Sequence, residues 1–458
     1  MLDVIVVGAG LSGLQAALSC QQAGLKVAVV EARNRVGGKI WSVPLASGQG
    51  FADLGAAWVN TNTQPRIRAY VNLFKIKLVE QRLEGNAVMM VSNDERIVYP
   101  FGITPEFQEE DKRDLERIRD HIQAISLRKE GPRPEHDSIS LDRYVRNLNA
   151  RSKTLEMVNV WVRVMHGLES TEESAAWFFD YCRRNLGLLS IRADDRTGGN
   201  HQRLCQGTQA IANSIAQLIG SNNVYLSSPA KSIDNYPTRV CVTTTNGEIF
   251  TARKCILSLP STMYQTLNFS PPLPSAVKEV SKSTTLGDYN KAIICYKKPW
   301  WREKGYNGFF MSYEGPCVVG RDTSVDENDI YSITCFINGQ PGREWSAKAP
   351  HERRSIILAQ LAKIFNESAN SEVYSPIEFF DQIWKHEEFS QGALAPVTAL
   401  GHLTKYKKVY GRPVGNVHFV GTEYSKEWKG YMEGALCSGE LGAMEVVDSL
   451  ARNERAIL

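Results

Sequence analysis

Residues 4–17 read VIVVGAGLSGLQAA, and this stretch decides the fold. A β-branched run ends in a glycine turn, and a helix-like segment and a second apolar run, KVAVVEAR at 26–33, follow it. Gly8, Gly10 and Gly13 have the spacing G-x-G-x-x-G, where a tight turn, the close approach of a pyrophosphate and helix packing each require a missing side chain. Glu31 ends the second run, where a carboxylate accepts a hydrogen bond from a ribose 2′-hydroxyl. These residues predict a βαβ unit that binds a dinucleotide.

The composition excludes several classes of partner. The chain has 458 residues, enough for two domains, with 53 Lys and Arg against 50 Asp and Glu. This near balance gives no electrostatic footprint for nucleic acid or an anionic membrane surface. The nine cysteines contain no C-x-x-C pair and the eight histidines show no ligand spacing, so we expect reduced thiols and no metal site.

The ends of the chain show no targeting segment. The first strand-like run starts at Leu2, and the final stretch DSLARNERAIL, 448–458, is typical of the end of a polar helix without an anchor. No apolar run reaches the length of a membrane span. We therefore expect a soluble protein of the cytoplasm.

The remaining patterns predict alternating strands and helices. Charges at helical spacing from about Glu106 to Glu130 leave one apolar stripe and predict a solvated amphipathic helix. Short alternating runs between Asn223 and Pro260, with a turn signal at Asn246–Gly247, predict a β-meander followed by a return strand. Further strands are expected at 289–301, 329–339 and 415–424, and helices at 351–365 and from Met432, with no linker between domains.

Three stretches together resemble the flavin-containing monoamine oxidase family. They are EARNRVGGKIWS at 31–42, DLGAAWV at 53–59 and FVGTEYSKEWKGYMEGA at 419–435. The resemblance implies an α/β fold in which a Rossmann-like FAD-binding domain is interleaved with an α+β substrate domain. It assigns residues 1–78, 204–279 and 386–458 to the first domain, and residues 79–203 and 280–385 to the second.

The same resemblance implies the residues that hold FAD. Met432 begins a helix whose N–H groups and dipole would face the flavin. Ala393 stands where covalent members carry the flavin-linking cysteine, so we expect noncovalent FAD, because alanine cannot form a thioether. Lys39 replaces an arginine and keeps its charge. The full predicted set is Gly8, Gly10, Ser12, Gly13, Glu31, Arg33, Gly38, Lys39, Gly55, Ala56, Ala57, Trp58, Ala230, Trp384, Ala393, Gly421, Glu423, Tyr431, Met432 and Ala435.

The substrate residues are implied in the same way. Tyr431 matches one of two aromatic residues that in relatives lie on either side of the amine. Leu394 stands at the position of the second aromatic residue, so only one aromatic wall is expected here. Arg192 falls near the position of the cavity entrance in relatives. We hypothesise that it binds an acidic or polar group at the far end of the substrate; the alternative is an ordinary surface arginine. The predicted set is Val164, Met165, Arg192, Asn200, Phe336, Leu394 and Tyr431, with His166 as a further wall residue.

Lys291 and Tyr431 are the predicted catalytic residues. Lys291 matches a lysine that relatives place, through a water, at flavin N5, where a cation stabilises charge as oxygen is reduced. The implied reaction transfers hydride from the α-carbon of a neutral amine to the flavin. Water hydrolyses the resulting imine, and dioxygen reoxidises the flavin and gives hydrogen peroxide.

Other readings remain open at this point. A polyamine or L-amino-acid oxidase, or a desaturase, would share the architecture, and a redox-silent FAD-binding module represents a different class. A monooxygenase would need a second nucleotide motif, and none follows Gly13; no accessory domain for chromatin is visible. The expected partners are a small-molecule amine and dioxygen, and a homodimer is left open.

Overall fold

The predicted βαβ unit is present in the computed structural model, which describes residues 1–103, 105 and 107–455. Strand β1 (Leu2–Val7) leads into helix α1 (Leu11–Gln22) and then into β2 (Val27–Val30). The two strands pair in parallel, and residues 4–7 of β1 are buried, as a continuous β-branched run predicts.

In the described residues, eight strands form the sheet that contains this unit. Its order is β13-β10-β11-β12-β1-β2-β9, and β21 also pairs with β12. The added strands are β9 (Val224–Tyr225), β10 (Ala230–Asn235), β11 (Val240–Thr244), β12 (Ile249–Leu257), β13 (Asn268–Ser270) and β21 (Val417–Phe419). The meander is confirmed for β10 to β12, with its predicted turn between β11 and β12. Its first run was wrongly assigned, because β9 pairs with β2 at the opposite edge.

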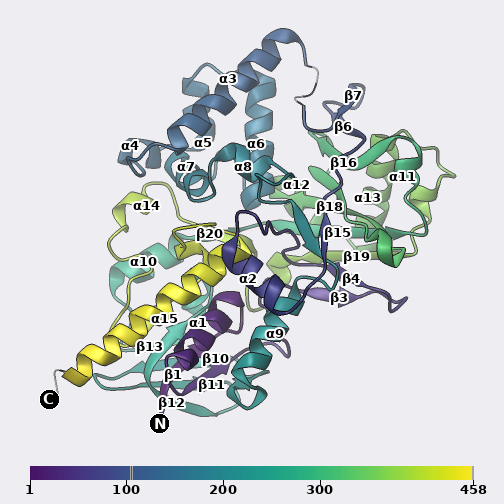
Figure 1. Cartoon of the computed structure of the whole chain (residues 1–458). Helices are drawn as coiled ribbons and strands as arrows, with labels where there is room; N and C mark the ends of the chain where they lie inside the picture. The colour runs from purple at the N-terminus through teal and green to yellow at the C-terminus, as the bar shows by residue number, and fades with distance from the viewer. Residues whose placement is uncertain (104, 106, 456–458) are drawn as a thin grey trace.

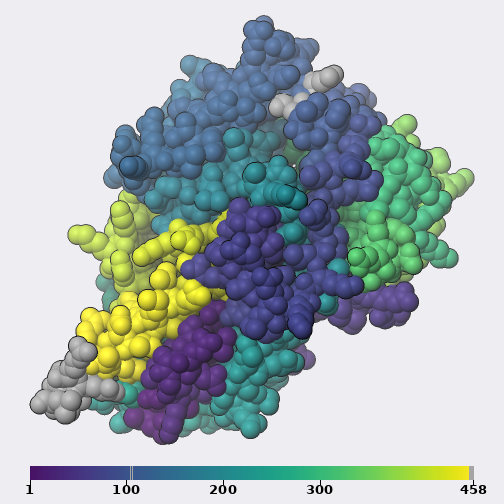
Figure 2. Space-filling model, in the orientation of Figure 1, coloured from purple at the N-terminus to yellow at the C-terminus, as the bar shows by residue number. Residues whose placement is uncertain are grey.

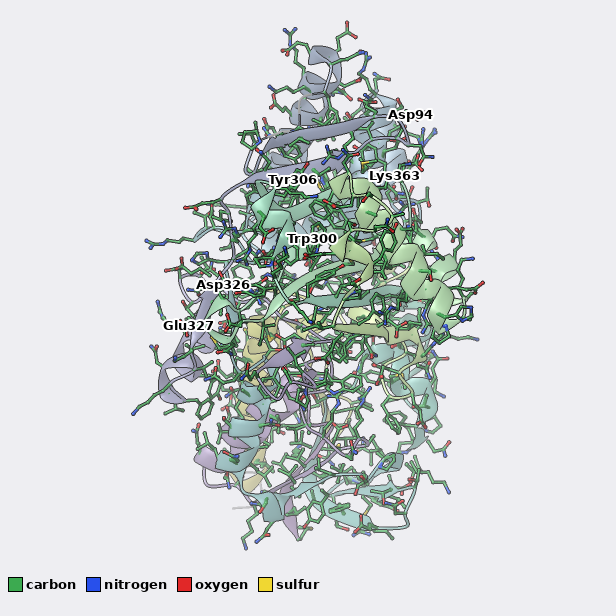
Figure 3. All side chains as sticks on the ribbon, turned by 90° about the vertical axis from the view of Figure 1, so that its right-hand side faces the viewer. Asp94, Trp300, Tyr306, Asp326, Glu327 and Lys363 are labelled. Atoms are coloured by element: carbon green, nitrogen blue, oxygen red, sulfur yellow. The ribbon has the colours of Figure 1, made fainter. Side chains whose placement is uncertain are left out.

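A second sheet has the order β19-β15-β18-β17-β16-β6-β7. Its strands are β6 (Asn86–Met90), β7 (Arg96–Pro100), β15 (Tyr289–Tyr296), β16 (Tyr306–Ser312), β17 (Val319–Asp322), β18 (Tyr331–Asn338) and β19 (Glu378–Ile383). The strand predicted over 289–301 is too long, since a helical turn, α11 (Trp300–Glu303), ends it. Trp300 and Tyr306, labelled in Figure 3, each lie 5.4 Å from the ring of Phe365. All strands of each of these two large sheets come from one predicted domain, but the domain boundaries themselves stay a prediction.

Helices surround the two sheets. A group gathers at the end of the molecule opposite the N-terminus, at the top of Figure 1. It contains α3 (Glu109–Ser126), α4 (Pro134–Asp137), α5 (Leu141–Asn147), α6 (Ser152–His166), α7 (Ala175–Arg184) and α8 (Leu188–Arg192). The apolar stripe predicted for α3 faces the core, with Leu115, Ile118 and Ile122 buried. Glu106, the first residue of that prediction, lies outside the described residues.

The remaining elements connect these layers. The helices are α2 (Pro65–Leu73), α9 (Gln209–Ile219), α10 (Ser275–Ser283), α12 (Gly339–Ser346), α13 (Pro350–Phe365), α14 (His402–Lys405) and α15 (Met432–Arg455). The strand pairs are β3 (Ser42–Pro44) with β4 (Phe51–Asp53), β5 (Leu78–Glu80) with β8 (Gln202–Leu204), and β14 (Thr285–Gly287) with β20 (Ala393–Val397). Short 3-10 turns lie at Ser221–Asn223, Ser261–Thr266, Asp326–Asn328, Glu372–Tyr374, Trp384–His386 and Thr422–Tyr424. Helices α13 and α15 confirm the predictions for 351–365 and from Met432; residues 456–458 of the C-terminal stretch lie outside the described residues.

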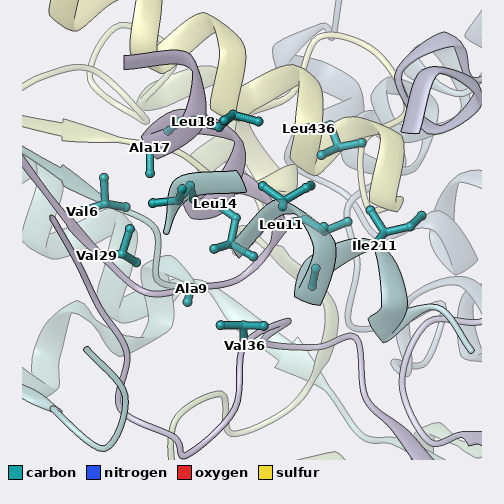
Figure 4. Packing of buried hydrophobic residues seen from close by; sticks show 14 of the residues in the cluster. Val6, Ala9, Leu11, Leu14, Ala17, Leu18, Val29, Val36, Ile211 and Leu436 are labelled. Carbon is teal, nitrogen blue, oxygen red and sulfur yellow. The ribbon is translucent and has the colours of Figure 1, made fainter. Parts of the chain in front are cut away.

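The first and last helices lie side by side. Figures 1 and 2 show α15 in yellow along α1 in purple, and Figure 4 shows Leu14 and Leu18 of α1 in one cluster with Leu436. Burying each such side chain stabilises the fold by about 1.5–3 kcal/mol. Gly439 permits this approach, because a Cβ there would lie 2.4 Å from the carbonyl oxygen of Ser12.

Replacing Gly439 tests this contact. The substitution Gly439→Ala should lower the free energy of unfolding by about 1–3 kcal/mol, since overpacking against a backbone oxygen outweighs the gain in helix propensity. Urea unfolding measures the change. Met444→Ala, at a position of α15 that is 62% exposed, is the control and should have little effect. An unchanged or higher stability for Gly439→Ala would contradict the close approach.

Candidate active site

One large cavity connects the two ends of the chain. Its volume is about 1090 Å³, and it extends from the glycine turn after β1 to the helices at the far end of the molecule. Residues of both termini line it, among them Gly10, Glu31, Tyr431 and Met432. The site therefore depends on the contact between α1 and α15.

The glycine turn is shaped to accept a phosphate group. Gly8 has φ +102°, which favours glycine, and a Cβ on Gly13 would lie 2.0 Å from the Gly8 carbonyl oxygen. A Cβ on Gly10 would meet no protein atom within 4 Å and would project into free space. Glu31 is buried and accepts hydrogen bonds from the N–H groups of Ala9 (2.7 Å) and Arg33 (2.9 Å), which fixes the turn. This arrangement fits the diphosphate and ribose of a dinucleotide.

The turn Arg35–Gly38, which has the pattern R-x-G-G, lies directly against this glycine motif. The Gly37 N–H donates to the Ala9 carbonyl oxygen at 2.8 Å, and a Cβ on Gly38 would come within 3.2 Å of the Gly10 Cα. The Lys39 ammonium donates to the Leu394 carbonyl oxygen at 2.7 Å. Burial lowers the pKa of Lys39 to about 8, while the Glu423 carboxylate opposes the change. A half-buried cation therefore lies between the N-terminal turn and β20.

The C-terminal glycine stretch forms the opposite wall. The Thr422 hydroxyl accepts a hydrogen bond from the Gly430 N–H (2.8 Å) and donates to the Tyr431 carbonyl oxygen (2.9 Å). A Cβ on Gly434 would lie 2.0 Å from the Trp428 carbonyl oxygen, so only glycine allows this tight entry into α15. The N-terminus of α15 therefore opens onto the cavity, where its free N–H groups favour an anionic ring.

Lys291 projects from β15 into the cavity. Its ammonium donates to the carbonyl oxygens of Asp53 (2.8 Å) and Gly55, and lies 5.6 Å from the ring centres of Trp58 and Phe336. Burial lowers the pKa of Lys291 to about 8, and the nearby Asp53 carboxylate acts in the opposite direction. The side chain is a desolvated cation beside aromatic rings.

The structure brings nearly all of the predicted residues together. Of the predicted cofactor set, only Gly13 does not line the cavity, because it packs against the turn. The predicted substrate residues Val164, Met165, Arg192, Asn200, Phe336 and Leu394 line it as well. The expectation for His166 is wrong: its ring is fully buried and paired with Glu173 at 2.8 Å, outside the lining.

The sequence did not predict several polar residues that line the cavity around the proposed amine position. Tyr181, Tyr289, Arg321 and Asp194 all line the cavity, and Arg321 lies 2.9 Å from Asp194. Tyr181 comes from α7 and stacks on Trp177, whereas Tyr289 and Arg321 lie on strands of the second sheet. The sequence offered one signal for this group of residues. Arg321 stands within a strand-like apolar run, VVGRDTS at 318–324, where a charged side chain is unusual.

The chain matches one family model along almost its whole length. The model for flavin-containing amine oxidoreductases covers residues 11–447. The chain therefore belongs to this family and is an FAD-dependent oxidoreductase that oxidises amines.

Across the described residues, every helix is too short or too polar to cross a membrane.

Individual relatives agree with this assignment. A probable flavin-containing monoamine oxidase A of Dictyostelium discoideum is 28% identical over 99% of both chains, and a flavin-containing amine oxidase of Oncorhynchus mykiss is 30% identical over 98% of this chain and 86% of its own. Among solved structures, putrescine oxidase bound to putrescine has a TM-score of 0.91 at 25% identity, with 98% of this chain and 99% of that chain covered. Cyclohexylamine oxidase from Brevibacterium oxydans has a TM-score of 0.90 at 24% identity, with the same coverage.

Substitution of Gly10 tests the cofactor site without a change in packing. Because the space around its Cβ is free of protein, Gly10→Ala should leave the stability of the flavin-free protein unchanged and weaken FAD binding at least about tenfold, which corresponds to ~1.4 kcal/mol. Fluorescence titration of the flavin-free protein with FAD measures this affinity. Gly131→Ala is the matched control, since its Cβ also meets nothing within 4 Å but lies away from the cavity. Equal FAD affinities of the two variants would show that the diphosphate does not pass Gly10.

Proposed function

We propose that the chain is an amine oxidase that holds FAD noncovalently between the glycine turn after β1 and the N-terminus of α15. The observation that supports noncovalent binding is the position of Ala393. This residue lies at the start of β20 and lines the cavity with a methyl group. A methyl group cannot form a thioether with the flavin. Retention of FAD therefore depends on the diphosphate turn, Glu31, the helix N-terminus and cations such as Lys39.

The reaction proposed is oxidation of an amine C–N bond. Bound FAD would supply the chemistry, by taking two electrons and two protons from the amine and passing them to dioxygen, which becomes hydrogen peroxide. Water converts the imine into a carbonyl compound and ammonia or a smaller amine. The protein contributes orientation and exclusion of water: Tyr431 and Leu394 flank the amine, and Val164, Met165 and Phe336 add apolar surface around it.

Lys291 is proposed to assist the oxygen step. Its ammonium is held by two backbone carbonyls in a water-poor wall of the cavity, where a positive charge stabilises negative charge on oxygen more strongly than in water. Since the pKa of Lys291 is lowered to about 8, the charge is present below that pH and is lost as the pH rises through it. The oxygen reaction should therefore slow above about pH 8.

Removing this charge separates the two half-reactions. Lys291→Met should slow reoxidation by dioxygen about 100-fold, leave anaerobic reduction by amine much less affected, and abolish the fall in oxygen reactivity near pH 8. Stopped-flow absorbance measures both steps. The control is Lys254→Met, because Lys254 is also buried but bonds Asn416 away from the cavity. A larger loss in the amine step than in the oxygen step would reject the assigned role.

The attachment of the flavin is directly measurable. Denaturation of the purified protein should release all of its flavin into the filtrate, since residue 393 offers no nucleophile. Ala393→Cys places a thiol at the same point of the wall and should retain part of the flavin on the chain after denaturation. Flavin that stays with the denatured wild-type chain would contradict noncovalent binding.

Three further predictions accompany this function. We propose that the protein is located in the cytoplasm, which agrees with its nine cysteines, all of them free thiols. A homodimeric state is a separate proposal. The division into an FAD-binding and a substrate domain at the predicted boundaries is also proposed, and is supported by the origin of the strands of the two large sheets.

A further inference from the structure

A buried ion pair faces the substrate half of the cavity. Arg321 on β17 places Nη1 2.9 Å from Oδ1 of Asp194, and their side chains are 11% and 2% exposed. Both residues line the cavity. Neither is needed to hold FAD or to perform the oxidation proposed above, so the pair requires another explanation.

Arg321 lies close to the residues proposed to surround the amine. Its guanidinium carbon is 5.6 Å from the ring centres of Trp58 and Phe309, and the Lys291 ammonium lies 5.6 Å from the same Trp58 ring. Burial raises the pKa of Tyr431, and the charge of Arg321 acts against this rise. Arg321 and Tyr431 therefore line the same cavity, and Arg321 shares the Trp58 ring with Lys291.

The donors of Arg321 are incompletely used. Asp194 is the only carboxylate within 4 Å of the Arg321 guanidinium among the described residues, whereas Nε is enclosed by protein and has no hydrogen-bond partner. Arg302, by contrast, bonds Asp322 and Asp326 through Nε and both terminal nitrogens. A guanidinium fork matches a carboxylate. Arg321 lines the cavity and is 11% exposed, so the part of its guanidinium that faces the cavity can meet a second anion beside Asp194.

A second arginine stands where the cavity meets solvent. Arg192, at the end of α8, is exposed, lines the cavity and lies over the Trp161 ring at 4.9 Å. It forms no ion pair with a described residue. The exposed side chain fits the alternative of a surface arginine, and it also lines the cavity.

The charges of this half of the cavity favour an anion. Its described lining carries Arg119, Arg192 and Arg321 against Asp194 and Asp195. The Asp195 carboxylate accepts hydrogen bonds from the Thr197 N–H (2.8 Å) and hydroxyl (2.6 Å) and keeps its charge, and Arg119 is paired with Asp120 at 2.8 Å. The arginines of this lining outnumber its carboxylates by one. A diamine would bring a second cation toward this excess of arginine.

We propose that the amine oxidised by this chain carries a carboxylate, which Arg321 binds inside the cavity and Arg192 attracts at its mouth. The inference rests on the proposed amine oxidation and names its substrate class. The oxidised bond and the electron balance are unchanged, because the carboxylate only anchors the molecule. Arg192 increases the rate of encounter, and Arg321 fixes the distance between the anchor and the amine.

Matched substrates test the proposal in the holoenzyme. Peroxide release gives kcat/KM for straight-chain aminocarboxylates, their amides, alkylamines and diamines of equal length. The wild type should prefer each carboxylate over its amide by about 10- to 100-fold, as expected for a charge-assisted contact. Arg321→Gln should abolish this preference and spare activity on the amides, and Arg321→Lys should restore part of it. Arg192→Gln should slow the carboxylates mainly at low salt.

Controls separate recognition from stability. Arg353→Gln removes an arginine that is similarly buried, 12% exposed, and paired with Asp381 at 2.7 Å outside the cavity, and it should leave the preference intact. If Arg321→Gln does not fold, the double variant Arg321→Gln/Asp194→Asn removes the pair without leaving a bare charge and should show the same loss of preference. A wild type that uses carboxylates and amides equally, or that prefers diamines and loses them in Asp194→Asn, overturns the inference but not the oxidation. If no amine yields peroxide, the proposed function itself fails.

Discussion

The close approach of α1 to α15 is the constraint on which the rest of the structure depends. Gly439 lets the two helices meet at the Ser12 carbonyl, and the turns before both helices then open onto one cavity. Neither end of the chain could form the site alone, because one supplies the phosphate turn and the other supplies a helix N-terminus and Tyr431. Cofactor binding and long-range folding are therefore coupled.

The same cavity contains the ammonium groups of two lysines whose charges are poorly compensated by the protein when no cofactor is bound. Lys39 and Lys291 both have a pKa lowered to about 8 by burial, which means that each charge is unfavourable in the folded chain. An anionic diphosphate and a reduced, anionic flavin ring would offset that cost. We infer that FAD binding stabilises the fold as well as enabling the reaction.

Local sequence predicted the elements that are continuous along the chain. The turn at Gly8–Gly13, the acid at Glu31, the stripe of α3 and the start of α15 follow from spacing and from residue type, and the structure confirms them. The partners of short strands did not follow, since β9 pairs with β2 through a contact that no local pattern contains. For the same reason the Arg321–Asp194 pair could not be predicted, because a strand of the second sheet and the segment after α8 meet only in the folded chain. His166 was misplaced because the resemblance that implied it does not say which face of α6 borders the cavity.

Anaerobic titration of the purified protein with an amine tests the central claim most directly. If the two ends of the chain hold FAD beside an amine site, the visible absorbance of the flavin should disappear on addition of amine and return when dioxygen is admitted, with one hydrogen peroxide formed per amine oxidised. A protein that binds no FAD on reconstitution, or whose flavin absorbance is unchanged by neutral amines, aminocarboxylates and diamines alike, would contradict the account.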